Sequence, residues 1–289
     1  MTLILGSRLL AEHAALERAR IDDAVGGGVD LERACAARGT GRFRGGMSRR
    51  GGGGVGPTQL LSGLVTSLGG SWLDGRSGVS GGASASGWAA VAGSLSVLQS
   101  TPANQPAYAG NIVTPDGVND FLVGATNPVS GATALTCDIV ASSPGWAGGS
   151  PVFVSLGTFA GGAPRVLLYA NGATDGISIF VEAPGATTNE WASGTTTMPL
   201  AVYTFQIDLS LGAAATVGVF KNGTLLGSRK TSGVCSGTFT NGSGIAIGAQ
   251  NTTPSNPSNP SILGITFLPT VSAANNAQRI PWLRSIYGV

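Results

Sequence analysis

The sequence predicts an all-β protein, a two-sheet sandwich behind a short helical, glycine- and arginine-rich N-terminal arm. Three observations support this fold class. Only 10% of the 289 residues are Asp, Glu, Lys or Arg, against about 25% in an average soluble domain, and 47 are glycine. Short apolar runs alternate with turns rich in Gly, Ser, Thr and Asn. Several of these runs are apolar on both faces, as expected for strands between two packed sheets.

Residues 1–57 form the predicted arm. Ser7 can cap a helix over residues 9–25, which ends at the glycines of positions 26–28. A flexible basic tether follows, because five arginines and no acidic residue lie between positions 38 and 50. The tether is either a disordered tail or an attachment arm that orders on a partner. Its attachment residues would be Arg38, Arg42, Arg44, Arg49 and Arg50.

Charge is distributed unevenly along the chain. Residues 1–50 carry nine of the 16 basic residues and six of the 14 acidic ones, so the remainder is nearly neutral. A nearly neutral domain argues against nucleic acid as a partner, since phosphates require clustered Lys and Arg. No run reaches the 18 apolar residues of a membrane span, and residues 1–10 are too short for a secretory signal. We expect a soluble, non-exported protein without membrane insertion. Met47 also reads as a chain start, so residues 1–46 could be an untranslated extension.

Residues 58–289 are predicted to form the sandwich domain. Residues 201–209 alternate between two faces, which indicates a half-buried strand. Asn222-Gly223 predicts a type I′ hairpin turn. The three prolines of residues 252–261 predict a surface loop. A short C-terminal helix through residues 275–279 should break or restart at Pro281. Further strands are expected to begin at Ala134, Pro151, Arg165, Gly176, Gly244 and Ile262.

The three cysteines do not form a metal-binding pattern. Cys35, Cys137 and Cys235 are widely spaced, and His13 is the single histidine of the chain. A structural zinc site is therefore not expected. Cys137 and Cys235 lie near strand-like runs, where a free cysteine behaves as a small buried hydrophobic residue. This usage fits assembly in a reducing cytoplasm.

Three motifs lie in order in the first half of the predicted sandwich. They are a Trp-x-Asp pair, a Gln-x-Thr-x-x-Asn-Gln-Pro-x-Tyr segment and an Asp-Gly-x-x-Asp-Phe turn. Their residues are Trp72 and Asp74; Gln99, Thr101, Asn104, Gln105, Pro106 and Tyr108; and Asp116, Gly117, Asp120 and Phe121. With the hairpin at residues 220–228, the motifs resemble concanavalin A-like, laminin-G-like domains of bacterial and bacteriophage proteins. The resemblance covers residues 70–289 and implies a jelly-roll sandwich. Pro281 and the long proline-rich loop depart from the family's pattern.

The sequence lacks a recognisable catalytic arrangement. A glycosidase on a sandwich fold would need two carboxylates flanking the sugar bond. After residue 50 the only glutamates are Glu182 and Glu190, eight positions apart with a Pro-Gly turn between them. His13 lies in the arm, so a Ser-His-Asp triad would have to join unrelated segments. We therefore expect a protein that is not an enzyme and needs no cofactor.

Two groups of residues are candidate binding sites. Asp116, Asn119 and Asp120 offer hard oxygen ligands suited to Ca²⁺. The alternative is that these side chains bind backbone amides in an Asx turn, which we favour. Trp146 and Trp191 lie in Gly- and Asn-rich segments and could present an aromatic platform to a sugar ring. The alternative, which we also favour, is that each tryptophan plugs one end of the sandwich.

The resemblance, together with the arm, implies a non-enzymatic structural or adhesion protein of a bacteriophage particle. Such a protein would be a head decoration, a collar component or a tail-fibre-associated module. It would be assembled in the host cytoplasm, with other virion proteins, further copies of itself or a cell-surface glycan as partners. The alternatives are a bacterial carbohydrate-binding, lectin-like module and a degenerate glycoside hydrolase. These functions rest on resemblance, because a fold does not fix a function.

Overall fold

The structure is a computed structural model of the chain. It describes residues 55–143, 151–157, 165–171, 176–183, 187–192, 197–210, 216–226, 228–231, 237–239, 244–250 and 258–289. Residues Gly54–Val289 form one compact unit. The predicted arm helix, the five attachment arginines, Met47, Cys35 and Cys235 all lie outside the described residues.

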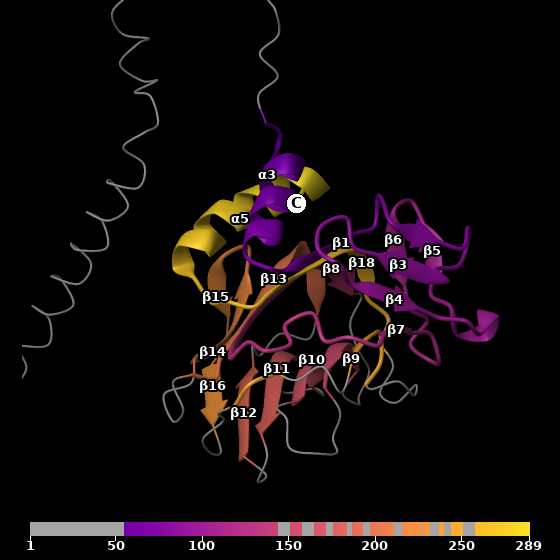
Figure 1. The fold of residues 1–289 in the computed structure, drawn as a ribbon. Coiled ribbons are helices and arrows are strands. Elements are labelled where there is room, and N and C mark those ends of the chain that lie inside the picture. Colours follow the sequence, from indigo (N-terminus) through magenta and orange to yellow (C-terminus); the bar gives the residue numbers. More distant parts are fainter. Residues whose placement is uncertain are drawn as a thin grey trace, which may run out of the picture. The chain divides into compact units, whose positions relative to one another are not determined.

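Two antiparallel sheets are stacked face to face, which confirms the predicted sandwich (Figure 1). The eight-stranded sheet runs in the order β15 (Thr224–Leu226), β14 (Thr216–Lys221), β13 (Met198–Asp208), β8 (Ala134–Ser143), β18 (Ser261–Leu268), β6 (Ile112–Thr114) and β5 (Ala107–Ala109), and β1 (Ser71–Asp74) pairs with β18. The ten-stranded sheet runs in the order β16 (Ser228–Thr231), β12 (Thr187–Ala192), β11 (Gly176–Ala183), β10 (Arg165–Asn171), β9 (Val152–Leu156), β17 (Ile245–Ile247), β7 (Leu122–Gly124), β4 (Ser96–Leu98), β3 (Gly87–Ala89) and β2 (Val79–Ser80). A 3₁₀ turn, η1 (Pro102–Asn104), precedes β5.

The main core lies between the sheets. Phe205 and Ile207 of β13 face Val154 of β9 and Ile179 of β11 within one buried cluster. Cys137 of β8 is part of this core, as predicted, and burial raises the pKa of its thiol well above the usual value. A buried thiol with a raised pKa is unreactive, so Cys137 contributes packing and not chemistry.

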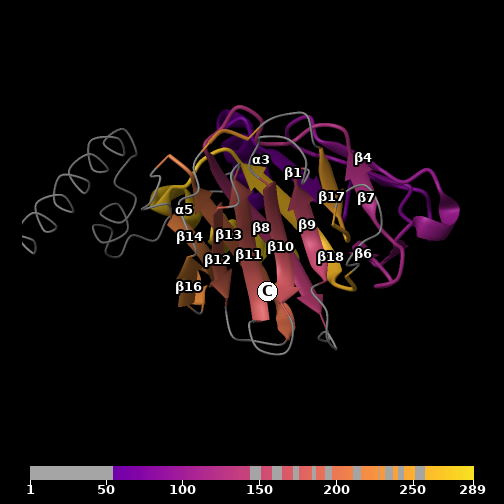
Figure 2. The same ribbon diagram turned by 90° about the horizontal axis from the view of Figure 1, so that it is seen from below.

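Helices α3 (Pro57–Ser67) and α5 (Ala273–Tyr287) cover the outer face of the eight-stranded sheet (Figures 1 and 2). Leu61 of α3 and Leu283 of α5 form a second buried cluster with Val202 of β13. Helix α3, at the start of the predicted sandwich domain, was not expected from the sequence. Proline at the first helical position suits a helix start, because its missing N–H would have no helical partner there.

The expected helix break at Pro281 is wrong. Helix α5 runs without interruption through Pro281, from a Ser272 cap that accepts a hydrogen bond from the Asn275 N–H to Gly288 in the left-handed conformation. A proline removes one helical hydrogen bond. The helix continues because Ile280 and Leu283, on either side of Pro281, are held in the second cluster. Tertiary packing thus outweighs the local preference of proline.

Two local predictions, the alternation of β13 and the hairpin turn that follows β14, are confirmed. The alternation of β13 is confirmed, because Tyr203, Phe205 and Ile207 enter the main core. The strand is not half-buried, however, since Thr204 on the opposite face is covered as well. The type I′ turn is confirmed by positive φ angles at Asn222 (51°) and Gly223 (85°).

Candidate functional site on the outer face of the ten-stranded sheet

Alternate residues of β10 and β11 face away from the main core. Val166 and Leu168 of β10 belong to that core, whereas Leu167 and Tyr169 belong to a separate small cluster with Val152 of β9. Phe180 of β11 packs against this small cluster. The central strands β9 to β12 lie side by side, as the view from below shows (Figure 2). The ten-stranded sheet therefore carries an apolar and aromatic cluster on its outer face, in which Leu167 and Tyr169 are buried and Phe180 is half-buried.

An ion pair borders this cluster. Arg165 of β10 and Glu182 of β11 are direct cross-strand partners, and their side chains approach to 3.1 Å. The Arg165 guanidinium also lies 5.8 Å from the centre of the Phe180 ring, within cation–π range. The Arg165 side chain is 5% exposed and that of Glu182 23%. Burial lowers the pKa of Arg165, and the neighbouring Glu182 opposes this effect. The ion pair places hydrogen-bond donors and an acceptor beside the Phe180 ring.

A serine hydroxyl adds a further polar group to the same face. Ser178 is the cross-strand partner of Tyr169 and two residues before Phe180. It is fully buried, and its hydroxyl has no hydrogen-bond partner within the described ranges. A buried polar group without a partner costs about 1–3 kcal/mol.

We call Arg165, Leu167, Tyr169, Ser178, Phe180 and Glu182 the outer-face site. Its chemistry suits a polyhydroxylated ligand. The half-buried Phe180 ring can pack against the C–H face of such a ligand, while the partly exposed Glu182 carboxylate can set its orientation. None of these residues was predicted from the sequence to bind a ligand. The available signal was that two strands, beginning at Arg165 and Gly176, follow each other closely in the sequence. If they pair as a hairpin, positions equally distant from the turn become cross-strand partners, as the structure shows.

The candidate calcium turn is an Asx turn, the alternative that the sequence favours. One carboxylate oxygen of Asp116 accepts hydrogen bonds from the backbone N–H groups of Val118, Asn119 and Asp120. Burial opposes ionisation of Asp116, but these N–H groups together lower its pKa. Asp120 accepts from the Asp116 N–H, and burial, followed by the charge of Asp116, raises the pKa of Asp120.

The side chain of Asn119 is also used structurally. Its amide donates to the Asn104 side chain at 3.0 Å. In the part of the chain that the structure describes, no group of three His, Cys, Asp or Glu side chains could hold a metal ion. One carboxylate oxygen each of Asp116 and Asp120 thus accepts hydrogen bonds from backbone N–H groups of the turn.

The other motif residues form a structural polar network. Trp72 donates its indole N–H to the Tyr287 hydroxyl at 3.1 Å, and that hydroxyl donates to Asp74 at 3.1 Å. Arg76 pairs with Asp74 at 2.7 Å and lies over the Tyr287 ring. The first strand is in this way fastened to the end of α5. Gln99 joins neighbouring segments, because its amide donates to the Phe121 carbonyl.

That Trp146 and Trp191 present an aromatic platform to a sugar ring stays a prediction. Trp146 lies outside the described residues. Trp191 lies in β12, where the strand register pairs it with Ile179 of β11 and Arg229 of β16. Within the described segments, no helix has the length and apolar character needed to cross a membrane.

Comparisons with known proteins give only distant similarities. No protein-family model and no curated protein matches the chain. A Trypanosoma rangeli sialidase in complex with sialic acid matches with a TM-score of 0.45 and 14% identity, over 75% of this chain and 33% of that chain. A Ruminococcus gnavus IT-sialidase CBM40 bound to α2,3 sialyllactose matches with a TM-score of 0.39 and 14% identity, over 52% of this chain and 82% of that chain. This chain spans about a third of the length of the sialidase chains that it matches. At these TM-scores the similarity carries no conclusion about ligand or activity.

Proposed function

We propose that the protein is a non-catalytic glycan-binding module and that the outer-face site binds the sugar. One observation carries this proposal. The Arg165–Glu182 ion pair and the half-buried Phe180 ring lie together on one face of the central strands. Glycan hydroxyls both donate and accept hydrogen bonds, and an adjacent cation and carboxylate can serve both roles. This function corresponds to the lectin-like alternative of the sequence analysis.

A glycan array followed by titration tests the proposal. Phe180→Ala should weaken binding of the glycan that the array identifies by about tenfold, since truncating a central aromatic contact typically costs more than 1 kcal/mol. Phe220→Ala is the matched control, because Phe220 is also half-buried but belongs to the eight-stranded sheet. No glycan bound by the full chain, or equal loss in both variants, would contradict the assignment.

The charges around the outer-face site favour binding over hydrolysis. The strand register places Glu190 opposite Phe180, on a strand adjacent to that of Glu182. Glu182 has Arg165 as its cross-strand partner, and their side chains approach to 3.1 Å. In this ion pair the Glu182 carboxylate serves as an acceptor for the Arg165 guanidinium. A glycosidase, by contrast, needs one of its two carboxyl groups protonated as a general acid.

We therefore expect no glycoside hydrolysis. The glycan that binds most tightly on the array should be recovered intact after prolonged incubation with the protein, as measured by mass spectrometry. Glu182→Gln should alter glycan affinity only. Turnover by the native chain that either Glu182→Gln or Glu190→Gln abolishes would show an enzyme instead.

We further propose that the module belongs to a bacteriophage particle, and the sequence resemblance supports this. In that setting the arm would attach the module to a virion protein through Arg38, Arg42, Arg44, Arg49 and Arg50. Arginine suits this role because its guanidinium makes paired hydrogen bonds to carboxylates. Capsid, portal or tail genes beside the gene for this chain would support the setting, and secretion genes in their place would oppose it.

A further inference from the structure

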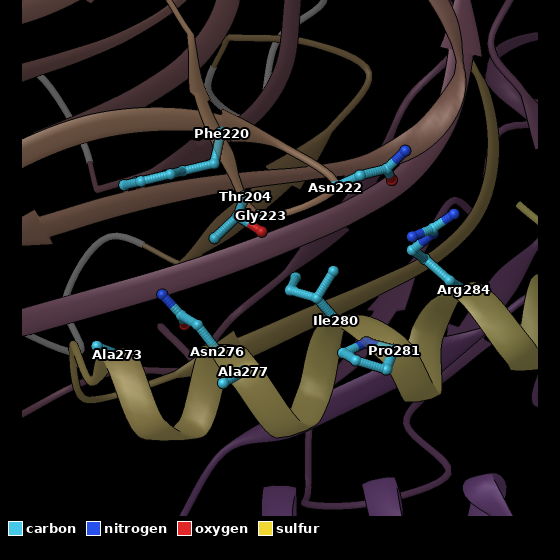
Figure 3. A pocket seen from close by; sticks show the side chains of 10 residues that line it. All are labelled: Thr204, Phe220, Asn222, Gly223, Ala273, Asn276, Ala277, Ile280, Pro281 and Arg284. Carbon is cyan, nitrogen blue, oxygen red and sulfur yellow. The ribbon is translucent and has the colours of Figure 1, made fainter. Parts of the chain in front are cut away.

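A groove on the opposite side of the molecule has no role in the proposed function. It lies between α5 and the β13–β14 part of the eight-stranded sheet and has a volume of about 420 Å³ (Figure 3). We call it the α5 groove. Residues of three elements line it: Thr204 of β13, Phe220 of β14, the turn residues Asn222 and Gly223, and Ala273, Asn276, Ala277, Ile280, Pro281 and Arg284 of α5. All of them belong to described segments.

The hollow results from small side chains on one stripe of the helix. Ala273, Ala277 and Pro281 follow each other at intervals of four residues, so they share one face of α5. All three are exposed. Larger residues, Ile280 and Phe220, form apolar walls (Figure 3). A volume of this size can take one or two apolar side chains.

The polar groups of the α5 groove are mainly hydrogen-bond donors. Asn222 uses its side-chain oxygen to accept from the Val202 N–H, which leaves its NH₂ group available. Asn276 likewise uses its oxygen to accept from Arg279, so its NH₂ group is also available. Both amide groups can therefore donate to a ligand. Pro281 has no N–H, so the carbonyl of Ala277, in the same stretch of helix, lacks its usual helical donor.

Arg284 is the one charged residue among those that line the α5 groove. Its Nε donates to a main-chain oxygen of Val289, the last residue of the sequence, and its terminal nitrogens have no acceptor in the described part of the chain. The lining includes no acidic side chain. A guanidinium next to an apolar hollow is complementary to a carboxylate adjoining an apolar side chain.

We propose that the α5 groove binds an extended peptide segment of a partner protein, with an apolar side chain in the hollow and a neighbouring carboxylate at Arg284. The amide donors of Asn222 and Asn276 would pair with backbone carbonyls of the segment. The Ala277 carbonyl would accept from one of its N–H groups. A peptide backbone supplies both donors and acceptors at regular spacing, which matches this set of groups.

Methyl NMR spectroscopy of the full chain tests the proposal with three capped tetrapeptides. The probes are acetyl-Gly-Leu-Glu-Gly-amide, its Gln analogue and its analogue with Gly in place of Leu. The Leu-Glu peptide should shift the methyl signals of Ala273, Ala277 and Ile280 at millimolar concentration. The Gln analogue should bind about two- to fivefold more weakly, the range expected for a solvent-exposed ion pair. The Gly analogue should not bind.

Two pairs of variants locate the binding. Ala277→Leu should abolish it by filling the hollow, whereas Ala274→Leu, the same change at an exposed position of α5 outside the groove, should not alter it. Arg284→Gln should remove the preference for Glu over Gln, whereas Lys221→Gln, a charge loss on β14 outside the groove, should retain it. Absence of shifts at these methyls, equal affinity for the Glu and Gln peptides, or equal loss in Ala274→Leu and Ala277→Leu would overturn the proposal.

Discussion

Replacing Arg279 by methionine should lower the free energy of unfolding by about 3–5 kcal/mol, the cost of leaving one member of a buried ion pair alone. Arg279 of α5 and Asp138 of β8 are both fully buried, and the guanidinium donates to both carboxylate oxygens of Asp138. Thr204 and Thr266, on the strands at either side, also donate to that carboxylate, at 2.7 and 2.5 Å. Without Arg279 the negative charge would stay buried with two hydroxyl donors.

Urea unfolding of the two variants and of the native chain measures this effect. The double variant Arg279→Met with Asp138→Val should lose less stability than Arg279→Met alone, because it leaves no isolated charge. It should remain below the native chain, since two threonine hydroxyls lose their acceptor. A loss of under about 1 kcal/mol for Arg279→Met would show that Asp138 finds another partner.

Gly264→Ala should cost about 2–3 kcal/mol, at the upper end of the usual range for overpacking. A Cβ atom at Gly264 of β18 would lie 2.1 Å from the Tyr287 hydroxyl oxygen and 2.6 Å from its ring. Tyr287 cannot move away easily, because its hydroxyl bonds both Trp72 and Asp74 and its ring lies under Arg76. The added methyl group should therefore displace the end of α5.

A double-mutant cycle separates this clash from any general effect of alanine in the strand. In a Tyr287→Ala background the additional cost of Gly264→Ala should fall below about 1 kcal/mol, because the opposing hydroxyl and ring are absent. Thermal or urea unfolding gives the four free energies. Equal costs in the two backgrounds would mean that Tyr287 is not the obstacle.

The features that the sequence determined by itself are local or periodic. The Asn222-Gly223 pair specified its hairpin turn, because few other residue pairs adopt positive φ angles at both central positions of a turn. The Asp116 turn was predictable for a similar reason, since the acceptor and its three donors lie within one segment of five residues. The alternation in β13 specified which residues would face the main core. These features together were sufficient for the two-sheet class.

The tertiary structure alone decided which distant residues meet. Arg279 and Asp138 are 141 positions apart, and neither segment carries a mark of its partner. Arg165 and Glu182 become a site only because β10 and β11 pair in one register. Helix α5 continues through Pro281, and the second face of β13 is buried, because the helix packs on the sheet. Backbone preferences act over a few residues, whereas ion pairs and buried surface depend on topology, which brings together segments far apart in the chain.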